Sequence, residues 1–162
     1  MKANYTVKHR RKREGRTNYK KRLSLLKSRK ERVVIRKTNT QLIIQVVKYQ
    51  DDGDKVLMTY KSSNLKKLGW NHSFKNLPGA YLAGLQAGLQ AKKLVKEAIP
   101  DFGLQTAHKG GKLYAALNGL LDAGLNVHAN KEVFPSEERL TGKHVDEKLV
   151  KDFEKIKEKL LK

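Results

Sequence analysis

The chain has 162 residues and no cysteine, and its 36 Lys or Arg against 16 Asp or Glu give a formal net charge of +20. This length suits one compact domain, and the absence of cysteine excludes a disulfide scaffold, a thiolate zinc site and a cysteine nucleophile. The sequence has no run of 18 apolar residues, and no apolar run follows its basic N-terminus, so we expect neither a membrane span nor a secretory signal. These features predict a cytoplasmic protein with a polyanionic partner.

The positive charge is concentrated at the N-terminus. Residues 1–37 contain 16 Lys or Arg and 2 Asp or Glu, a net charge of +14, which leaves +6 for the other 125 residues. Such a segment repels itself and has little apolar surface to offset the entropy of ordering, so we expect an arm, residues 1–30, that a polyanion orders. The alternatives for the basic run at 8–13 are a solubilising tail and a nuclear localisation signal.

A short helix is predicted within this arm, with Thr17 as its N-cap. Tyr19, Leu23 and Leu26 follow at helical spacing, so they should place one apolar stripe against the body. The cations of this helix should then point outward: Lys20, Lys21, Arg22 and Lys27. A fixed pattern of cations is something a folded RNA can select, whereas solubility alone does not require it.

Three β-branched runs follow the arm, at residues 32–36, 42–47 and 56–60. The first two are separated by a polar turn at 38–40, which predicts a hairpin. The third follows the turn signal Asp51-Asp52-Gly53-Asp54. The three runs together predict a three-stranded antiparallel meander.

Helical spacing begins at Pro78 and continues to about Val95. Ala80, Gly84 and Gly88 repeat every four residues, which predicts a stripe of small residues packed closely on a sheet, a membrane helix-dimer motif being the alternative. Further along we expect a strand at 97–104, a helix at 111–123 and an extended segment at 125–127. Residues 31–145 therefore read as a layered α/β body.

The C-terminal residues 146–162 predict an amphipathic helix, with Leu149, Phe153, Ile156 and Leu160 on one face. We expect this helix to dock on the body and complete the core. Binding of a separate partner is the alternative.

Motifs of catalysis and metal binding are weak in this sequence. The five histidines show no metal-ligand spacing, no phosphate-binding loop of the nucleotide hydrolases occurs, and we expect no cofactor. Asp51, Asp52 and Asp54 could be ligands of a nuclease metal, but aspartates are common in hairpin turns. Ser136 is read as a helix start rather than as part of an acid and base pair.

A glycine pair precedes the helix expected at 111–123, in the sequence His108-Lys109-Gly110-Gly111-Lys112. Glycines let the backbone approach an anion, and free N–H groups at a helix start favour phosphate. An ordinary flexible loop is the alternative. The basic arm favours the phosphate interpretation.

Several segments follow one another in the order of a known family. They are residues 10–23, 32–39 with Gln45, 69–70, 78–85, 101–104, 122–125 and 142–144. They closely resemble the archaeal large-subunit ribosomal protein family L18, the counterpart of eukaryotic L5. The resemblance covers nearly the whole chain, except that residues 147–162 look shorter than in longer relatives and match no motif.

The resemblance implies a structural protein of the large ribosomal subunit, not an enzyme. Its implied partners are 5S rRNA, which it would attach to the large rRNA in the central protuberance, and neighbouring ribosomal proteins. It also implies a three-layer, ribonuclease-H-like α/β fold with a basic N-terminal extension. The RNA contacts of the family carry over onto Lys8, Arg10, Arg11, Lys12, Arg13, Arg16, Tyr19, Lys20, Arg22, Arg36, Lys37, Thr38, Asn39, Gln45, Lys109, Gly110, Gly111 and Lys112.

Two alternatives to this function remain open at the level of sequence. One is a basic protein, such as a chaperone, that binds RNA without specificity. The other is a metal-dependent nuclease on a ribonuclease-H-like scaffold, in which Asp101 would act. Within the expected interface, Asn39 and Gln45 could read base edges, and Tyr19 could stack on a base or pack its own helix.

Overall fold

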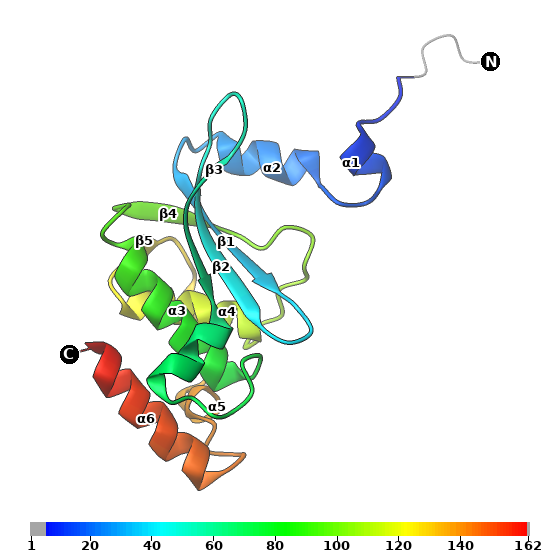
Figure 1. The fold of residues 1–162 in the computed structure, drawn as a ribbon. Coiled ribbons are helices and arrows are strands. Elements are labelled where there is room, and N and C mark those ends of the chain that lie inside the picture. The colour runs from blue at the N-terminus through cyan, green and yellow to red at the C-terminus, as the bar shows by residue number, and fades with distance from the viewer. Residues whose placement is uncertain (1–5, 162) are drawn as a thin grey trace.

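The computed structural model describes residues 6–161. The chain begins with two short helices, α1 (Arg10–Arg13) and α2 (Tyr19–Leu26), which form an extension at one end of the molecule (Figure 1). The body contains strands β1 (Glu31–Lys37), β2 (Leu42–Lys48), β3 (Lys55–Lys61), β4 (Glu97–Asp101) and β5 (Asn126–Val127). Its helices are α3 (Leu77–Ala91), α4 (Lys112–Asp122), α5 (Glu137–Thr141) and α6 (Glu147–Leu161), with short 3-10 helices at Ser62–Leu68 and Lys131–Val133.

The five strands form one mixed sheet in the order β3-β2-β1-β4-β5. β1 pairs antiparallel with β2, and β2 with β3, whereas β1 with β4 and β4 with β5 are parallel. Successive residues of a strand point to opposite faces. On β1, the fully buried Val33 and Ile35 therefore lie on the face that carries the core, while Val34 and Arg36 lie on the opposite, outer face.

α3 and α4 cross so closely that a side chain at the contact would not fit. A Cβ at Gly84 would collide with the backbone oxygen of Ala116, and one at Gly119 with the backbone oxygen of Tyr81. The prediction that the small-residue stripe packs on the sheet was therefore wrong: Gly84 and Gly88 face α4. Small residues at helical spacing indicate that another element packs closely on that face of the helix, but they do not indicate whether this element is a strand or a second helix.

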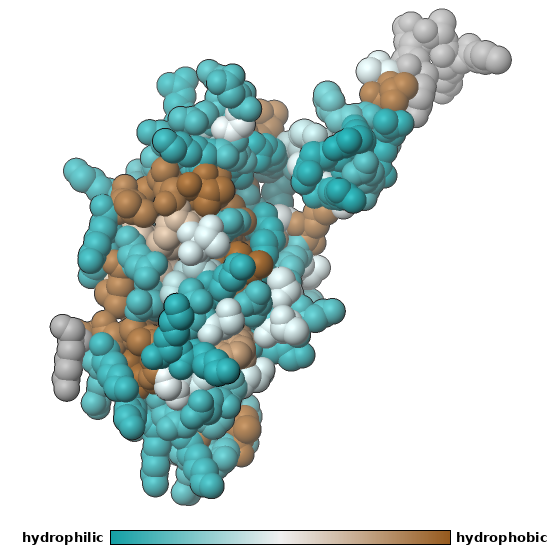
Figure 2. All heavy atoms as spheres, in the orientation of Figure 1, coloured by the Kyte–Doolittle hydropathy of each residue, from teal (hydrophilic) through white to brown (hydrophobic). Residues whose placement is uncertain are grey.

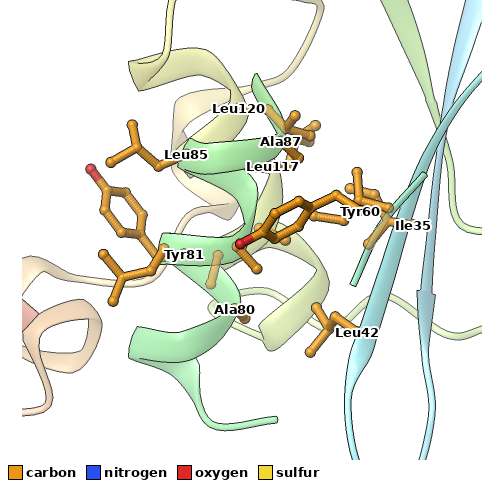
Figure 3. Packing of buried hydrophobic residues seen from close by; sticks show 14 of the residues in the cluster. Ile35, Leu42, Tyr60, Ala80, Tyr81, Leu85, Ala87, Leu117 and Leu120 are labelled. Carbon is orange, nitrogen blue, oxygen red and sulfur yellow. The ribbon is translucent and has the colours of Figure 1, made fainter. Parts of the chain in front are cut away.

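The core lies between the sheet and this helix pair. Figure 3 shows Ile35, Leu42 and Tyr60 of the strands pointing toward α3, with Leu117 and Leu120 of α4 beside it. Burial raises the pKa of Tyr60 to about 12, so its hydroxyl stays protonated at neutral pH.

α6 packs on the far side of α3. Its residues Leu149, Phe153 and Ile156 are buried in the same core, and the rings of Phe153 and Tyr81 have centroids 5.5 Å apart. This burial confirms the predicted docking of the C-terminal helix on the body. No helix within residues 6–161 is both long and apolar enough to cross a membrane.

The outer face of the sheet is the side toward which the arm folds. Leu25 of α2 lines a groove together with Val34 of β1, Val47 of β2 and Val56 of β3. α3 and α4 thus occupy one face of the sheet, and α2 lies over one end of the opposite, outer face. The fold is an α/β arrangement in which the arm and the outer sheet face enclose a common space.

Candidate nucleic-acid interface

The first part of the arm exposes a dense set of cations. α1 consists of four of them, Arg10 to Arg13, and none of these four residues is buried. Glu14 lies 3.5 Å from Nε of Arg10 and 3.2 Å from Nε of Arg16, in exposed ion pairs that water screens strongly. In Figure 2 the arm projects from the body as an almost wholly hydrophilic extension.

The helix α2 begins one residue later than predicted. Asn18 is its N-cap, and its side-chain oxygen accepts a hydrogen bond of 3.0 Å from the backbone N–H of Lys21. Thr17 does not act as the cap, because its hydroxyl accepts a hydrogen bond of 2.9 Å from Nε of Arg11. This bond ties α1 to the start of α2.

The face of α2 that packs on the body also differs from the prediction. Leu25 and Leu26 are half-buried, but Leu23 is 58% exposed, so the predicted stripe that included Leu23 was wrong. Arg22 is half-buried and turned toward the body rather than outward. The side of α2 toward the body therefore carries Arg22, Leu25 and Leu26, a combination that the spacing of apolar residues alone does not indicate.

Arg22 begins a chain of alternating charges that crosses the outer face of the sheet. Its guanidinium donates two hydrogen bonds to Asp54, at 2.8 and 2.9 Å. Nη2 of Arg32 lies 2.7 Å from the same carboxylate, and Nη1 of Arg32 donates to Asp101 at 3.0 Å. Arg36 completes the chain with a contact of 3.3 Å to Asp101.

The interior of this chain is buried. Arg32 is 3% exposed and Asp101 is 7% exposed, and buried charges are tolerated only when they are paired. The hydrogen bond from Arg22 holds the pKa of Asp54 below its ordinary value, with a further contribution from Arg32, although partial burial opposes the shift. The same pairing raises the pKa of Arg22. Both groups are therefore charged at neutral pH.

A groove of about 440 Å³ lies between the arm and the outer face of the sheet, and we call it the arm–sheet groove. The cations that line it are Arg11, Arg16, Lys21, Arg22, Arg32 and Arg36, and its carboxylates are Asp54 and Asp101. Six positive and two negative groups give the lining a net charge of +4. The groove is thus built to attract an anion.

The structure brings together some of the residues expected to bind RNA and separates others. Arg11, Arg16, Arg22, Arg36 and Gln45 line the arm–sheet groove although they come from the arm and from two strands. Lys21 and Gln105 line it too and were not among the predicted site residues. Lys21 donates to the backbone oxygen of Gly103 at 3.0 Å, a contact across 82 residues that no local pattern indicates.

The remaining arm residues stay on the surface. Lys8, Lys12, Arg13 and Lys20 are exposed. Tyr19 is half-buried, with its ring centroid 5.2 Å from that of His9, so it packs within the arm.

The tip of the β1–β2 hairpin is exposed and rigidly held. The N–H and the hydroxyl of Thr38 both donate to the backbone oxygen of Gln41, at 2.9 and 2.8 Å. The side-chain oxygen of Gln105 accepts a hydrogen bond of 2.8 Å from the backbone N–H of Lys37, and its side-chain nitrogen donates one of 2.6 Å to the backbone oxygen of Lys37. Lys37 and Asn39 therefore project their side chains from a fixed turn.

The glycine loop before α4 departs from the prediction in one respect. The N–H groups of Gly110 and Gly111 are not free, because each donates a hydrogen bond of 2.9 Å, to Val133 and to His108 respectively. Gly110 has φ +69°, a left-handed conformation that suits glycine. Lys109 is exposed and Lys112 is half-buried, so the two lysines, rather than the glycine amides, are what this loop offers to an anion.

Of the carboxylates considered as nuclease ligands, Asp51 and Asp52 are exposed in the turn before β3, and the other two are engaged by arginines. Asp54 and Asp101 pair with arginines, as described above. Within residues 6–161, no group of three or more His, Cys, Asp or Glu side chains is arranged to hold a metal ion.

Comparison with known proteins gives a consistent result. Residues 3–98 match the family model described as "Ribosomal large subunit proteins 60S L5, and 50S L18". The chain is 51% identical over 142 residues to the large ribosomal subunit protein uL18 of Korarchaeum cryptofilum, covering 87% of this chain and 73% of that relative. It is 43% identical over 162 residues to uL18 of Methanothrix thermoacetophila, covering 97% of this chain and 96% of that relative.

These matches, with the α/β fold and the basic arm, define a ribosomal protein and not an enzyme. The nuclease alternative is therefore not supported. The chain belongs to the uL18 family of large-subunit ribosomal proteins, and the archaeal relatives confirm the resemblance found in the sequence.

Proposed function

We propose that this protein is a structural component of the large ribosomal subunit in the cytoplasm, where it binds 5S rRNA and attaches it to the large rRNA in the central protuberance. Membership of the uL18 family supports the ribosomal role. Neighbouring ribosomal proteins of the central protuberance are further partners in this proposal. The RNA-binding surface consists of the arm, the hairpin tip, the arm–sheet groove and the lysines of the loop before α4.

The observation that carries the proposal is the convergence of cations from distant parts of the chain on one face. Arg11 and Arg16 of the arm and Arg36 of β1 line the same groove, whose net charge is +4. A solubilising tail would not need to be fixed against a sheet. A polyanion of defined shape explains why the cations hold a fixed pattern.

The fold is also part of the proposal. The sheet order β3-β2-β1-β4-β5, with β2 antiparallel to both of its neighbours and helices α3 and α4 on one face, supports a ribonuclease-H-like body at residues 31–145, to which α2 of the arm adds the third layer on the opposite face. The boundaries of the arm, residues 1–30, and of the C-terminal helix, residues 146–162, belong to the same interpretation.

Charge supplies affinity in this mechanism, and RNA shape supplies selectivity. Each phosphate that a Lys or Arg neutralises releases counterions, so affinity falls with salt at a slope of about −0.9 per contact on duplex nucleic acid. Selectivity comes from the unpaired bases that Asn39 and Gln45 reach from the hairpin and from the sheet.

Competition between RNAs at near-physiological salt tests the proposal. Labelled 5S rRNA is bound to the protein and displaced by unlabelled 5S rRNA or by an unrelated folded RNA of the same length. We expect 5S rRNA to compete at a much lower concentration. Equal competition would instead identify a basic protein that binds RNA without specificity, such as a chaperone.

A further inference from the structure

We propose that the arm–sheet groove binds one unpaired nucleotide of the RNA, with the base inside the groove and the adjoining phosphate against Arg11 and Arg16. This inference rests on the proposed function, because it states which part of the RNA occupies one particular site. It goes further in assigning a ligand to a groove that no sequence motif marks.

The size of the groove and its place between a helix and a sheet favour a single nucleotide. Its volume of about 440 Å³ is in the range of pockets that hold small ligands. The bases of an RNA duplex are stacked and paired, and proteins contact such a duplex from outside, across its shallow groove. Only a nucleotide that has left the stack can enter a space between a helix and a sheet.

The walls offer apolar surface for the face of a base. Val56 of β3 is 48% exposed and Leu104, in the loop after β4, is 53% exposed, and both line the groove. Val34 also lines the groove and forms part of its floor; it belongs to β1, which lies between β3 and β4 in the sheet. Exposed apolar side chains in the lining of a basic groove suit a ligand with an apolar face and an anionic group, which describes a nucleotide.

Gln45 is the side-chain amide in the groove whose acceptor oxygen accepts no hydrogen bond within residues 6–161. Its Nε2 donates to Thr59 at 3.0 Å. The other two amides are committed to the backbone: Gln105 bonds to Lys37 at both ends, and the side-chain oxygen of Asn18 caps α2. Gln45 can therefore hydrogen-bond a base edge as both donor and acceptor.

The phosphate position follows from the arginines that keep free donors. Nε of Arg11 donates a hydrogen bond to Thr17, and Nε of Arg16 forms an ion pair with Glu14. No hydrogen bond within the described part of the chain engages the Nη atoms of either arginine. Arg36, by contrast, directs its Nη atoms to Asp101 and to the backbone of Ile35. Arg11 and Arg16 thus present planar donor pairs, the geometry that suits phosphate oxygens.

Filling the groove without changing charge tests the inference. Val56→Trp should weaken 5S rRNA binding about tenfold at fixed salt. Because it blocks the base and removes no cation, it should lower the magnitude of the salt slope by no more than about 0.9, the share of the one adjoining phosphate. The matched control is Val145→Trp, at a valine that is 65% exposed and lies outside the groove. Wild-type affinity in Val56→Trp would overturn the inference. If this variant unfolds at a lower temperature than the control, Leu104→Trp in the loop after β4 replaces it, with the same expectation.

Cross-linking identifies what enters the groove. A photoreactive phenylalanine at Leu104 should cross-link to one unpaired nucleotide of 5S rRNA. Cross-links spread along paired segments would contradict the inference. The two proposals can fail separately. Without a wild-type preference for 5S rRNA the proposed function fails, whereas wild-type affinity in the tryptophan variants rules out only the groove site.

Discussion

Arg22 of α2 and Asp54, in the turn before β3, form a bidentate pair with hydrogen bonds of 2.8 and 2.9 Å across 32 residues of sequence. This pair is a principal contact between the arm and the body, because no residue of α2 is buried. Helices with little buried apolar surface open more readily than the core around them. The position of the arm, and with it the arm–sheet groove, therefore depends on a polar contact.

Arg22→Ala should loosen α2 from the sheet without unfolding the body. The pair is partly exposed, so its loss should cost about 0.5–1 kcal/mol, or roughly a two- to fivefold faster amide hydrogen exchange in α2. Hydrogen exchange read by mass spectrometry measures this. The control is Lys20→Ala, an exposed cation on the same helix. Equal protection in the two variants would show that Arg22 does not hold the arm.

Acid should weaken the same contact. The pKa of Asp54 in the folded protein lies below its ordinary value of 3.8, since Arg22 donates hydrogen bonds to the carboxylate. A carboxyl group with a lowered pKa stabilises the fold above its unfolded pKa, and this contribution disappears as pH falls through the folded pKa. Asp54→Asn should therefore be less stable than wild type at pH 7. Denaturant unfolding between about pH 2 and pH 7 should show this difference shrinking below about pH 4.

Asp101→Asn should destabilise the body more strongly than Asp54→Asn. The substitution leaves the buried Arg32, 3% exposed, without one of its two carboxylate partners. Removing one member of a buried ion pair typically costs about 3–5 kcal/mol. Urea unfolding measures the loss. Asp51→Asn, at an exposed position of the turn before β3, is the control and should change stability by less than about 0.5 kcal/mol.

The elements of the fold were predictable because local patterns mark them. The strands at 32–36, 42–47 and 56–60 are lengthened by one residue or so at their ends, and α6 docks as its apolar face predicts. α3 ends at Ala91 rather than near Val95, and β4 ends at Asp101 rather than at Leu104. Boundaries of this kind depend on caps and turns more than on periodicity.

The candidate site was predictable as a set of cations but not as a groove. Arg11, Arg36 and Gln45 were expected at the interface. The pairing of β1 with β2 brings Arg36 and Gln45 together, and Arg11 joins them through contacts of the arm with the body such as that of Arg22 with Asp54. Such a contact joins residues far apart in the sequence, and neither periodicity nor composition records it. The apolar spacing likewise places Leu23 on the packed face of α2, where the structure has Arg22, Leu25 and Leu26 instead.

Deleting residues 1–16 should weaken binding to 5S rRNA and flatten its dependence on salt. The deletion removes seven Lys or Arg, and none of the described side chains in this segment is buried, so the thermal unfolding of the body should change little. Titrations at several salt concentrations measure the slope. The control replaces the exposed Lys151, Lys155 and Lys159 of α6 with Ala. It also removes positive charge, but it should leave the salt slope of binding close to that of wild type. An unchanged slope after the deletion would show that the arm does not contact this RNA.

The loop before α4 makes its contribution through lysines, if it contacts RNA as we propose, because the N–H groups of Gly110 and Gly111 are already bonded within the protein. Replacing both Lys109 and Lys112 with Ala should therefore reduce the magnitude of the salt slope by up to about 1.8, since each lost phosphate contact accounts for about 0.9 on a duplex. The matched control removes the same charge elsewhere, at the exposed Lys92 and Lys93 after α3. Filter binding to 5S rRNA from 50 to 200 mM salt compares the two double variants. Equal slopes would mean that the loop contributes only long-range charge, and the glycines would then serve to shape the turn into α4.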